Sequence, residues 1–359
     1  MRIAIVGTEL CPVDREGGGL EQVLRRWAAA LAGRHDVVVL SHRRDGRPGA
    51  DAAFEVVPLD RTADLGPALD RLRPDVVSLH NRPQWAPRCP SMAAVAVTFH
   101  NYPVAWKVGA RSGGVVRRTA PALALSAVSG TLASAAATAL GVEPDVVTVT
   151  PPSVDPAFLS APPWRPEPVV LSPNRLLRKK GVHDLLAVAP RFPDITFSFA
   201  DLISPWVQPT AEHRALRRAI GATPNAALFA PPPSPAALAS LYVASAVVAC
   251  PAREPEGLGL VALEAQACGV PLVATCEGGL VEATLAPNRC VPAGDRDALA
   301  AALTEALGRR GSGDGPARTI AARFAPGPSA AVFESWLARA VESGAVESRT
   351  DRRCAGSGR

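Results

Sequence analysis

Short apolar runs alternate with longer amphipathic segments along most of the chain, which has 359 residues. Residues 2–7 form a mainly apolar run, as in strands that are buried on both faces of a parallel sheet. Residues 20–31 place apolar side chains at helical spacing, and residues 36–40 form a second apolar run. A strand, a glycine-rich loop, a helix and a strand in this order predict a Rossmann-like α/β opening.

The same alternation continues on both sides of a proline-rich segment at 151–168, which should be a stiff connector. Because single cores rarely grow beyond about 250–300 residues, we expect two α/β domains, 1–160 and 161–325. An amphipathic helix is predicted within 326–343, and a disordered tail at 344–359. Further strands are predicted at 54–58, 75–79, 94–99, 123–128, 146–150, 169–172, 195–200, 227–230, 247–250 and 270–274, and further helices at 183–188, 235–242 and 298–307.

The most informative stretch runs from Glu256 to Pro271 and carries two glutamates on either side of a glycine turn and an apolar helix. Glu264 is the one charge between residues 258 and 276, and a carboxylate in so apolar a segment needs hydrogen-bond donors. Glu256 precedes the turn, where the amides of Gly257, Leu258 and Gly259 can point toward a ligand at the helix N-terminus. The alternative is a helix cap and a buried glutamate that the protein itself satisfies.

Two other groups of residues stand just after predicted strands, where doubly wound sheets bind ligands. His80-Asn81 and His100-Asn101 each follow a strand of the first half. Arg175 and Lys180 lie in a basic loop after the first strand of the second half, and could grip a phosphate. The alternative for this loop is a solvated basic turn.

Composition narrows the class of partner. A net charge of +5, dispersed along the chain, suits an anionic ligand or a peripheral membrane contact, and argues against nucleic acid. The seven Cys show no Cys-x-x-Cys pair and, with no secretory leader in view, predict a reduced, cytoplasmic protein. Residues 120–142 carry no charge, but their small residues, Pro121 and Gly130 disfavour a transmembrane helix. The first glycine loop lacks the Gly-x-Gly-x-x-Gly spacing of a nicotinamide dehydrogenase.

The stretch from Glu256 to Pro271 closely resembles the signature of glycosyltransferase family 4, the retaining nucleotide-sugar-dependent enzymes with the GT-B fold. Gly18-Gly19-Leu20-Glu21 resembles the family's Gly-Gly-x-Glu loop, and the loop from Arg175 to Lys180 resembles its Arg…Lys-Gly element. The resemblance implies two Rossmann-like domains, a cleft between them, and a last helix that crosses back to the first domain. It implies transfer of a sugar from a nucleoside-diphosphate sugar, with UDP expected, to a hydroxyl group with retention of configuration.

The resemblance also implies roles for individual residues. His100 would lie beside the reacting carbon and the acceptor, and Glu256 would orient the donor sugar. Glu264 would hold the ribose, and no metal or other cofactor is expected. The donor-binding set implied in this way is Gly18, Gly19, Arg175, Lys180, Glu256, Gly257, Leu258, Gly259 and Glu264.

Some positions depart from the family pattern and keep other readings open. Leu258 replaces the commoner Phe, Asn174 replaces a Gly, and the linker has Pro152-Ser153-Val154-Asp155 without the usual Asn-Gly. The alternatives are an inactive sugar-nucleotide-binding partner and an epimerase of the same fold. We expect a small polar acceptor, such as a natural-product or aminocyclitol core, with a surface glycan or glycolipid as the alternative.

Overall fold

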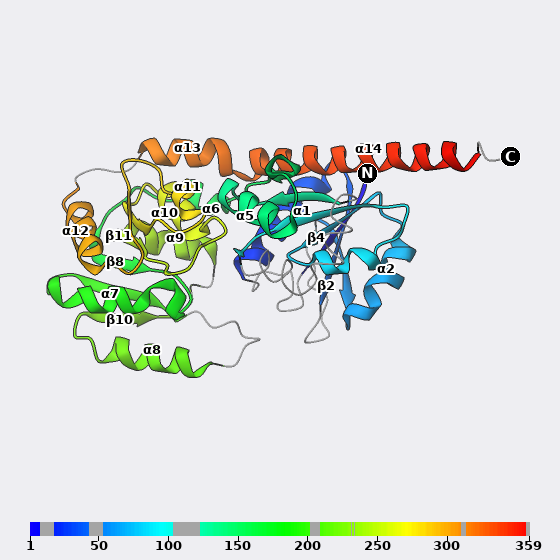
Figure 1. Cartoon of the computed structure of the whole chain (residues 1–359). Coiled ribbons are helices and arrows are strands. Elements are labelled where there is room, and N and C mark those ends of the chain that lie inside the picture. The colour runs from blue at the N-terminus through cyan, green and yellow to red at the C-terminus, as the bar shows by residue number, and fades with distance from the viewer. Residues whose placement is uncertain are drawn as a thin grey trace. The chain divides into compact units, whose positions relative to one another are not determined.

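The computed structural model describes residues 1–7, 18–42, 53–102, 123–201, 209–230, 232, 234–309 and 314–356, of which residues 42, 314 and 344–356 are described by their backbone alone. The chain divides into two compact units (Figure 1). One unit comprises Met1–Ser153 with Pro326–Arg359, and the other comprises Val154–Ala325. The first boundary therefore precedes the predicted residue 160. The backbone N–H of Val154 bonds to Phe324, and Phe158 packs edge-on against Tyr242, so these residues belong to the second unit.

The first unit is a parallel sheet with the strand order β3-β2-β1-β4-β5-β6-β7. Its strands are short apolar runs, as predicted, because both faces of the sheet are covered. The strands are β1 (Arg2–Val6), β2 (Asp36–His42), β3 (Glu55–Leu59), β4 (Val76–His80), β5 (Ala94–Phe99), β6 (Ala124–Ala127) and β7 (Val147–Val149), and the helices are α1 (Gly19–Ala32), α2 (Leu65–Leu72), α5 (Gly130–Leu140) and α14 (Pro326–Gly356).

The second unit is a parallel sheet with the order β10-β9-β8-β11-β12-β13. One face packs against α7, α8 and α12 around buried residues such as Phe197, Val247 and Leu303. The strands are β8 (Glu167–Ser172), β9 (Thr196–Ala200), β10 (Ala226–Phe229), β11 (Ser245–Cys250), β12 (Leu272–Thr275) and β13 (Arg289–Val291), and the helices are α6 (Pro156–Leu159), α7 (Val182–Val188), α8 (Ala211–Gly221), α9 (Pro235–Ala244), α10 (Leu260–Ala267), α11 (Leu280–Ala283), α12 (Arg296–Leu307) and α13 (Asp314–Phe324).

Both sheets reverse their strand order at one point. In the first unit the reversal falls between β1 and β4, and in the second between β8 and β11. Open α/β sheets bind ligands outside the carboxyl ends of the strands at such a point. The loops after β8 and β11 carry the predicted residues Arg175, Lys180 and Glu256.

Helix α14 returns the chain to the first unit. Phe333 stacks on Trp27 with ring centroids 4.1 Å apart, and the Trp27 indole donates a hydrogen bond to Ser329 Oγ. Figure 1 shows α14 as one uninterrupted helix. It continues to Gly356, where we expected a disordered tail from residue 344. The segment has no proline before 356 and includes Ala, Glu and Arg, so its backbone can stay helical without burying apolar side chains.

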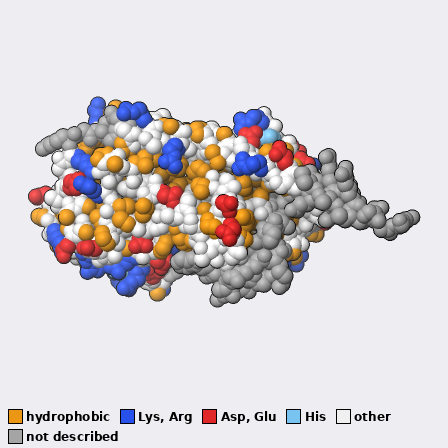
Figure 2. Space-filling view, turned by 45° about the horizontal axis from the view of Figure 1, so that its top comes forward, with side chains coloured by type: hydrophobic (Ala, Val, Ile, Leu, Met, Phe, Trp, Pro, Cys, Tyr) orange, Lys and Arg blue, Asp and Glu red, His pale blue; other side chains and the backbone are white. Residues whose placement is uncertain are grey.

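Surface charge is mixed in the view of Figure 2. Lys and Arg side chains lie in several separate groups on this face, with Asp and Glu side chains among them. Neighbouring charges of opposite sign partly cancel each other's field. Among the described helices, none combines the length and the apolar content that crossing a bilayer requires.

Candidate active site

The basic loop after β8 is held closely against the loop after β11. Residues Arg178–Lys180 form a single 3-10 turn that ends at Gly181, whose φ is +72°. A Cβ atom at Gly181 would lie 1.7 Å from the carbonyl oxygen of Pro251, so only glycine permits this approach. Arg253 N–H also bonds to the Lys179 carbonyl oxygen at 2.8 Å. The two loops therefore form one packed surface at the reversal point of the sheet.

Lys180 and Glu256 meet on this surface. The Nζ atom of Lys180 lies 2.6 Å from Oε1 of Glu256, and the two side chains are 17% and 23% exposed. The family resemblance implied separate tasks for these two residues, so their direct pairing is a new finding. The pair lies at the reversal point of the sheet, where an arriving phosphate could take over the ammonium group. Arg175 is exposed in the same loop, as is Arg178.

The glycine turn after Glu256 is covered by residues 278–279. Glu256 forms a β-bridge with Gly278, and its carbonyl oxygen accepts a hydrogen bond from Gly279 N–H at 2.8 Å. Gly259 is the N-cap of α10 with φ +95°, and makes no side-chain capping bond. Gly257 and Leu258 are buried. The turn therefore leads directly into α10, the helix that was predicted to follow it, and the role of its amides in binding a ligand stays a prediction.

Glu264 lies in helix α10, and its carboxylate has a hydrogen-bond donor that the sequence analysis did not predict. The hydroxyl of Tyr242, on α9, donates to Oε2 of Glu264 at 2.8 Å. Burial, followed by the nearby Glu264 carboxylate, raises the pKa of Tyr242 well above its usual range. Tyr242 therefore remains a donor at every physiological pH. The predicted ligand hydroxyls would share this carboxylate with Tyr242.

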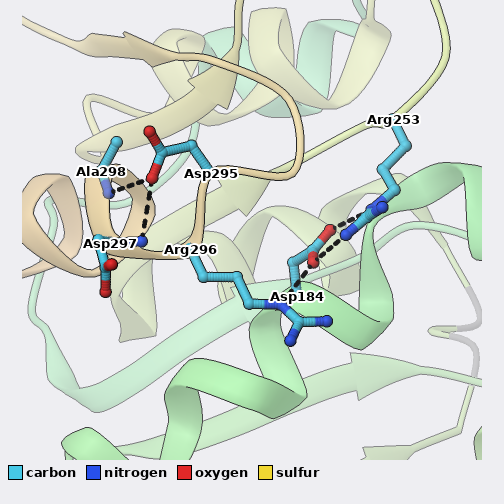
Figure 3. Close-up of polar contacts among 6 residues, drawn as sticks. All are labelled: Asp184, Arg253, Asp295, Arg296, Asp297 and Ala298. Atoms are coloured by element: carbon cyan, nitrogen blue, oxygen red, sulfur yellow. Dashed lines mark hydrogen bonds and ion pairs between the residues drawn. The ribbon is translucent and has the colours of Figure 1, made fainter.

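A buried carboxylate binds an arginine of the loop after β11 and an arginine at the start of α12 (Figure 3). Asp184, on α7, is 2% exposed and receives Arg253 through both carboxylate oxygens, at 2.6 and 2.5 Å. Arg296 adds a third bond at 3.0 Å. Burial raises the pKa of Asp184, but the hydrogen bonds from the two arginines outweigh burial and hold the pKa below its usual range. The cluster ties the start of α7 to the loop that carries Glu256.

The first unit presents a separate polar cluster at the ends of β4 and β5. Nε2 of His100 lies 3.0 Å from Nδ1 of His80, and Nε2 of His80 lies 3.1 Å from Ser78 Oγ. The backbone N–H of His100 donates to Asn81 Oδ1 at 2.8 Å. Asn81 itself has φ +57°, a conformation that asparagine tolerates better than most residues. The two strand-end histidines predicted from the sequence are therefore in direct contact.

The first glycine loop is described only at its end. Gly18 is the N-cap of α1, and Glu21 in the first turn of the helix is buried. A Cβ at Gly18 would lie 3.0 Å from Oε2 of Glu21. Gly19 begins the helix. Residues 8–17 lie outside the described part, so the predicted role of Gly18 and Gly19 in donor binding stays a prediction.

The histidine pair should make the first unit sensitive to mild acid. Burial lowers the pKa of His100 to about 3, and burial with the neighbouring His100 lowers that of His80 further below its usual range. Both rings therefore stay neutral in the folded state while the unfolded chain takes up protons below about pH 6.5. The free energy of unfolding should fall as the pH drops from 6.5 toward 5, approaching about 1.4 kcal/mol per pH unit for each histidine.

Urea unfolding at pH 7, 6 and 5 measures this effect, and His100→Gln should remove about half of the slope. Partial burial also lowers the pKa of His183, which adds a smaller contribution in the same window. An unfolding free energy that is equal at pH 7 and pH 5 would show that the pair does not stay neutral.

Two family descriptions match adjoining parts of the chain. "Glycosyltransferase Family 4" matches residues 17–158, and "Glycosyl transferases group 1" matches residues 161–318. A glycogen synthase from Mycobacterium tuberculosis is 30% identical over 374 residues, which cover 86% of each protein. A D-inositol 3-phosphate glycosyltransferase from Acidothermus cellulolyticus is 35% identical over 167 residues, which cover 40% of this chain and 36% of the relative.

Solved structures agree on the fold. A glycosyltransferase from Rickettsia africae superposes with a TM-score of 0.74 at 16% identity, covering 95% of this chain and 98% of that one. Anabaena HepE in complex with UDP gives 0.71 at 18% identity, with 94% and 100% covered. A glycosyltransferase involved in avilamycin A biosynthesis gives 0.69 at 18% identity, with 95% and 98% covered. The chain therefore belongs to the family 4 and group 1 glycosyltransferases, and its two parallel-sheet Rossmann-like domains are those of the GT-B fold.

Proposed function

We propose that this glycosyltransferase moves a sugar from a UDP-sugar to a hydroxyl of a small polar acceptor, with retention of configuration. The observation that carries the proposal is the Lys180–Glu256 pair at the reversal point of the second sheet, with Arg175 exposed in the same loop. One cation and one carboxylate at such a site can bind a diphosphate and the hydroxyls of an adjoining sugar at once. Structures of Anabaena HepE with UDP support the choice of nucleotide.

In the proposed reaction the bond between the anomeric carbon and the diphosphate oxygen breaks, and a bond to the acceptor oxygen forms. The acceptor's hydroxyl proton passes to the leaving diphosphate. Arg175 and Lys180 stabilise the negative charge that builds on the diphosphate, which is electrostatic catalysis by groups already in position. Glu256 orients the sugar, Glu264 binds the ribose while Tyr242 holds its carboxylate, and no metal is required. The cleft between the two domains, which would bring His100 to the donor, stays a prediction.

The acceptor is proposed from two relatives. One aligned relative acts on D-inositol 3-phosphate, a small polar cyclitol, by its name, and one structural neighbour is involved in avilamycin A biosynthesis. The first name supports a small hydroxylated acceptor, and the second supports a natural-product acceptor. A cytoplasmic reaction with at most a peripheral membrane contact is part of the same proposal. A growing glycan is the second candidate, because the relative that covers 86% of the chain is named glycogen synthase. Transfer assays with inositol phosphates and with malto-oligosaccharides as acceptors separate the two.

Removing either of the two side chains proposed to bind the phosphates should weaken binding of UDP. We expect Arg175→Ala and Lys180→Ala to cost about 1.5–3 kcal/mol each, as for hydrogen bonds to charged groups. Lys180→Ala should lose more binding free energy than Arg175→Ala, because it also leaves the Glu256 carboxylate without its cation beside the anionic diphosphate. Isothermal titration calorimetry with UDP measures both. Arg178→Ala is the matched control, since this exposed arginine of the same loop should not change the affinity. Three variants that all bind UDP like the parent would refute the phosphate site.

A further inference from the structure

Three polar side chains of the first unit form a hydrogen-bonded series that ends at His100. Ser78 and His80 are fully buried, and His100 is partly exposed at the end of the series. Ser78 Oγ lies 3.1 Å from His80 Nε2, and His80 Nδ1 lies 3.0 Å from His100 Nε2. A contact of this length between two ring nitrogens requires one proton between them. Which ring supplies that proton decides what His100 can offer to a substrate.

Two arrangements satisfy the contact when both rings are neutral. In the first, His80 carries its proton on Nδ1 and donates it to His100, which then carries its own proton on Nδ1. In the second, His100 donates from Nε2 to His80, and His80 carries its proton on Nε2 and donates it to Ser78. The first leaves His100 with an N–H for the substrate, and the second leaves it with a lone pair.

The hydroxyl of Ser78 favours the first arrangement. Its hydrogen-bond partner among the described residues is Nε2 of His80, so this nitrogen is the acceptor available to the hydroxyl hydrogen. In the first arrangement the hydroxyl donates to that nitrogen. In the second the hydroxyl accepts, and its hydrogen stays unpaired at a position with no exposure to water. Buried donors without an acceptor are rare, because the free energy lost on removing the donor from water is not recovered by a new hydrogen bond.

We propose that His80 is a positioning residue that holds His100 as the Nδ1–H tautomer, so that His100 meets the substrate as a hydrogen-bond donor and not as a base. The inference deepens the proposed function and rests on it for the role of His100 in transfer. Asn81 restrains the backbone of His100, and the rings of Trp27 and His100 lie 5.9 Å apart. A donor fixed in this way can bind an oxygen lone pair of the sugar or the acceptor while the diphosphate receives the proton.

The tautomer can be measured without any substrate. Histidine labelled with ¹⁵N gives separate signals for protonated and unprotonated ring nitrogens, and the chain has only six histidines. Signals are assigned with single His→Gln variants. We expect a proton on Nδ1 of both His80 and His100 and none on either Nε2 atom. A proton on Nε2 of His100 in the intact protein would overturn the proposal.

Two substitutions of His80 separate its two hydrogen bonds. The amide of Asn in His80→Asn lies near the Nδ1 position and can still donate to His100, whereas the amide of Gln in His80→Gln reaches toward Ser78. We expect His80→Asn to keep the Nδ1–H signal of His100 and to retain more turnover. His80→Gln should lose that signal and lower kcat at least about tenfold, with KM for the donor little changed, because a wrong tautomer affects the reacting step.

The outcomes are distinct from those of the proposed function. UDP affinity reports on Arg175 and Lys180, so its loss or retention is independent of the His100 signal. A His80→Gln protein that keeps the parental kcat would refute the positioning role even if the tautomer is as inferred. If either buried substitution prevents folding, Ser78→Ala gives the same test in the spectrum. Removing the Ser78 donor should leave His100 as a mixture of tautomers, and a spectrum identical to that of the parent would count against the series.

Discussion

Replacing Glu256 by Gln should lower the rate of sugar transfer at least about 100-fold and leave UDP binding intact or slightly tighter. The carboxylate is proposed to orient the sugar at the reacting carbon, where small displacements have large effects on rate. It also pairs with Lys180 at 2.6 Å, and the neutral amide would leave that ammonium free for the diphosphate. Single-turnover transfer with the donor found in a thermal-shift screen of nucleotide sugars gives the rate, and calorimetry gives the UDP affinity.

Glu264→Gln is the matched variant in the same helix region. It should raise KM for the donor about tenfold with little change in kcat, because ribose does not react and a bond to a charged group contributes about 1.5–3 kcal/mol. Tyr242 can still donate to the Gln carbonyl oxygen, so packing is preserved. If Glu256 served only the helix end, Gln would cost at most about 1 kcal/mol of stability and leave the rate unchanged. A folded Glu256→Gln protein with the parental rate would therefore refute its assignment.

Replacing Gly181 by Ala should lower the free energy of unfolding by about 2–5 kcal/mol. The left-handed backbone at φ +72° costs an L-residue about 1–2 kcal/mol, and forcing extra atoms into a packed site costs about 1–3 kcal/mol. The atom that the new Cβ meets at 1.7 Å is the backbone carbonyl oxygen of Pro251. The loop after β11 must therefore shift, and with it Arg253 and Glu256. Donor binding should weaken in the same variant.

Gly221→Ala is the control, because it ends α8 and a Cβ there has no atom within 4 Å. We expect it to leave stability unchanged or to raise it by up to about 1 kcal/mol, since Ala has the higher helix propensity. Urea unfolding, followed through the transition of the second unit, compares the two variants. Equal midpoints for Gly181→Ala and the parent would show that the two loops can separate without cost.

Local pattern was enough to predict the two parallel-sheet domains. Every strand of the first unit and all but β13 of the second is an apolar run that was predicted, and the order strand, loop, helix limits the connection to a parallel sheet. The local pattern also predicted the turn at Gly257 and Gly259, because glycines followed by an apolar helical run are typical of a loop that enters a helix. It did not predict β13 or the helices α2, α5, α6, α8, α11 and α13, and the charged end of α14 was taken as disorder from its polarity.

The sequence by itself determined which residue types stand at the ends of the strands, including His80, His100, Arg175, Lys180 and Glu256. Tertiary structure alone decided which of them touch. Lys180 pairs with Glu256 across 76 positions, Asp184 holds Arg253 and Arg296 across 69 and 112 positions, and Tyr242 binds Glu264 from another helix. Such contacts depend on where parallel strands are placed side by side, and neither the spacing nor the polarity of a residue carries that information. The charges and tautomers that set the chemistry follow from these contacts, because burial and hydrogen-bond partners fix them.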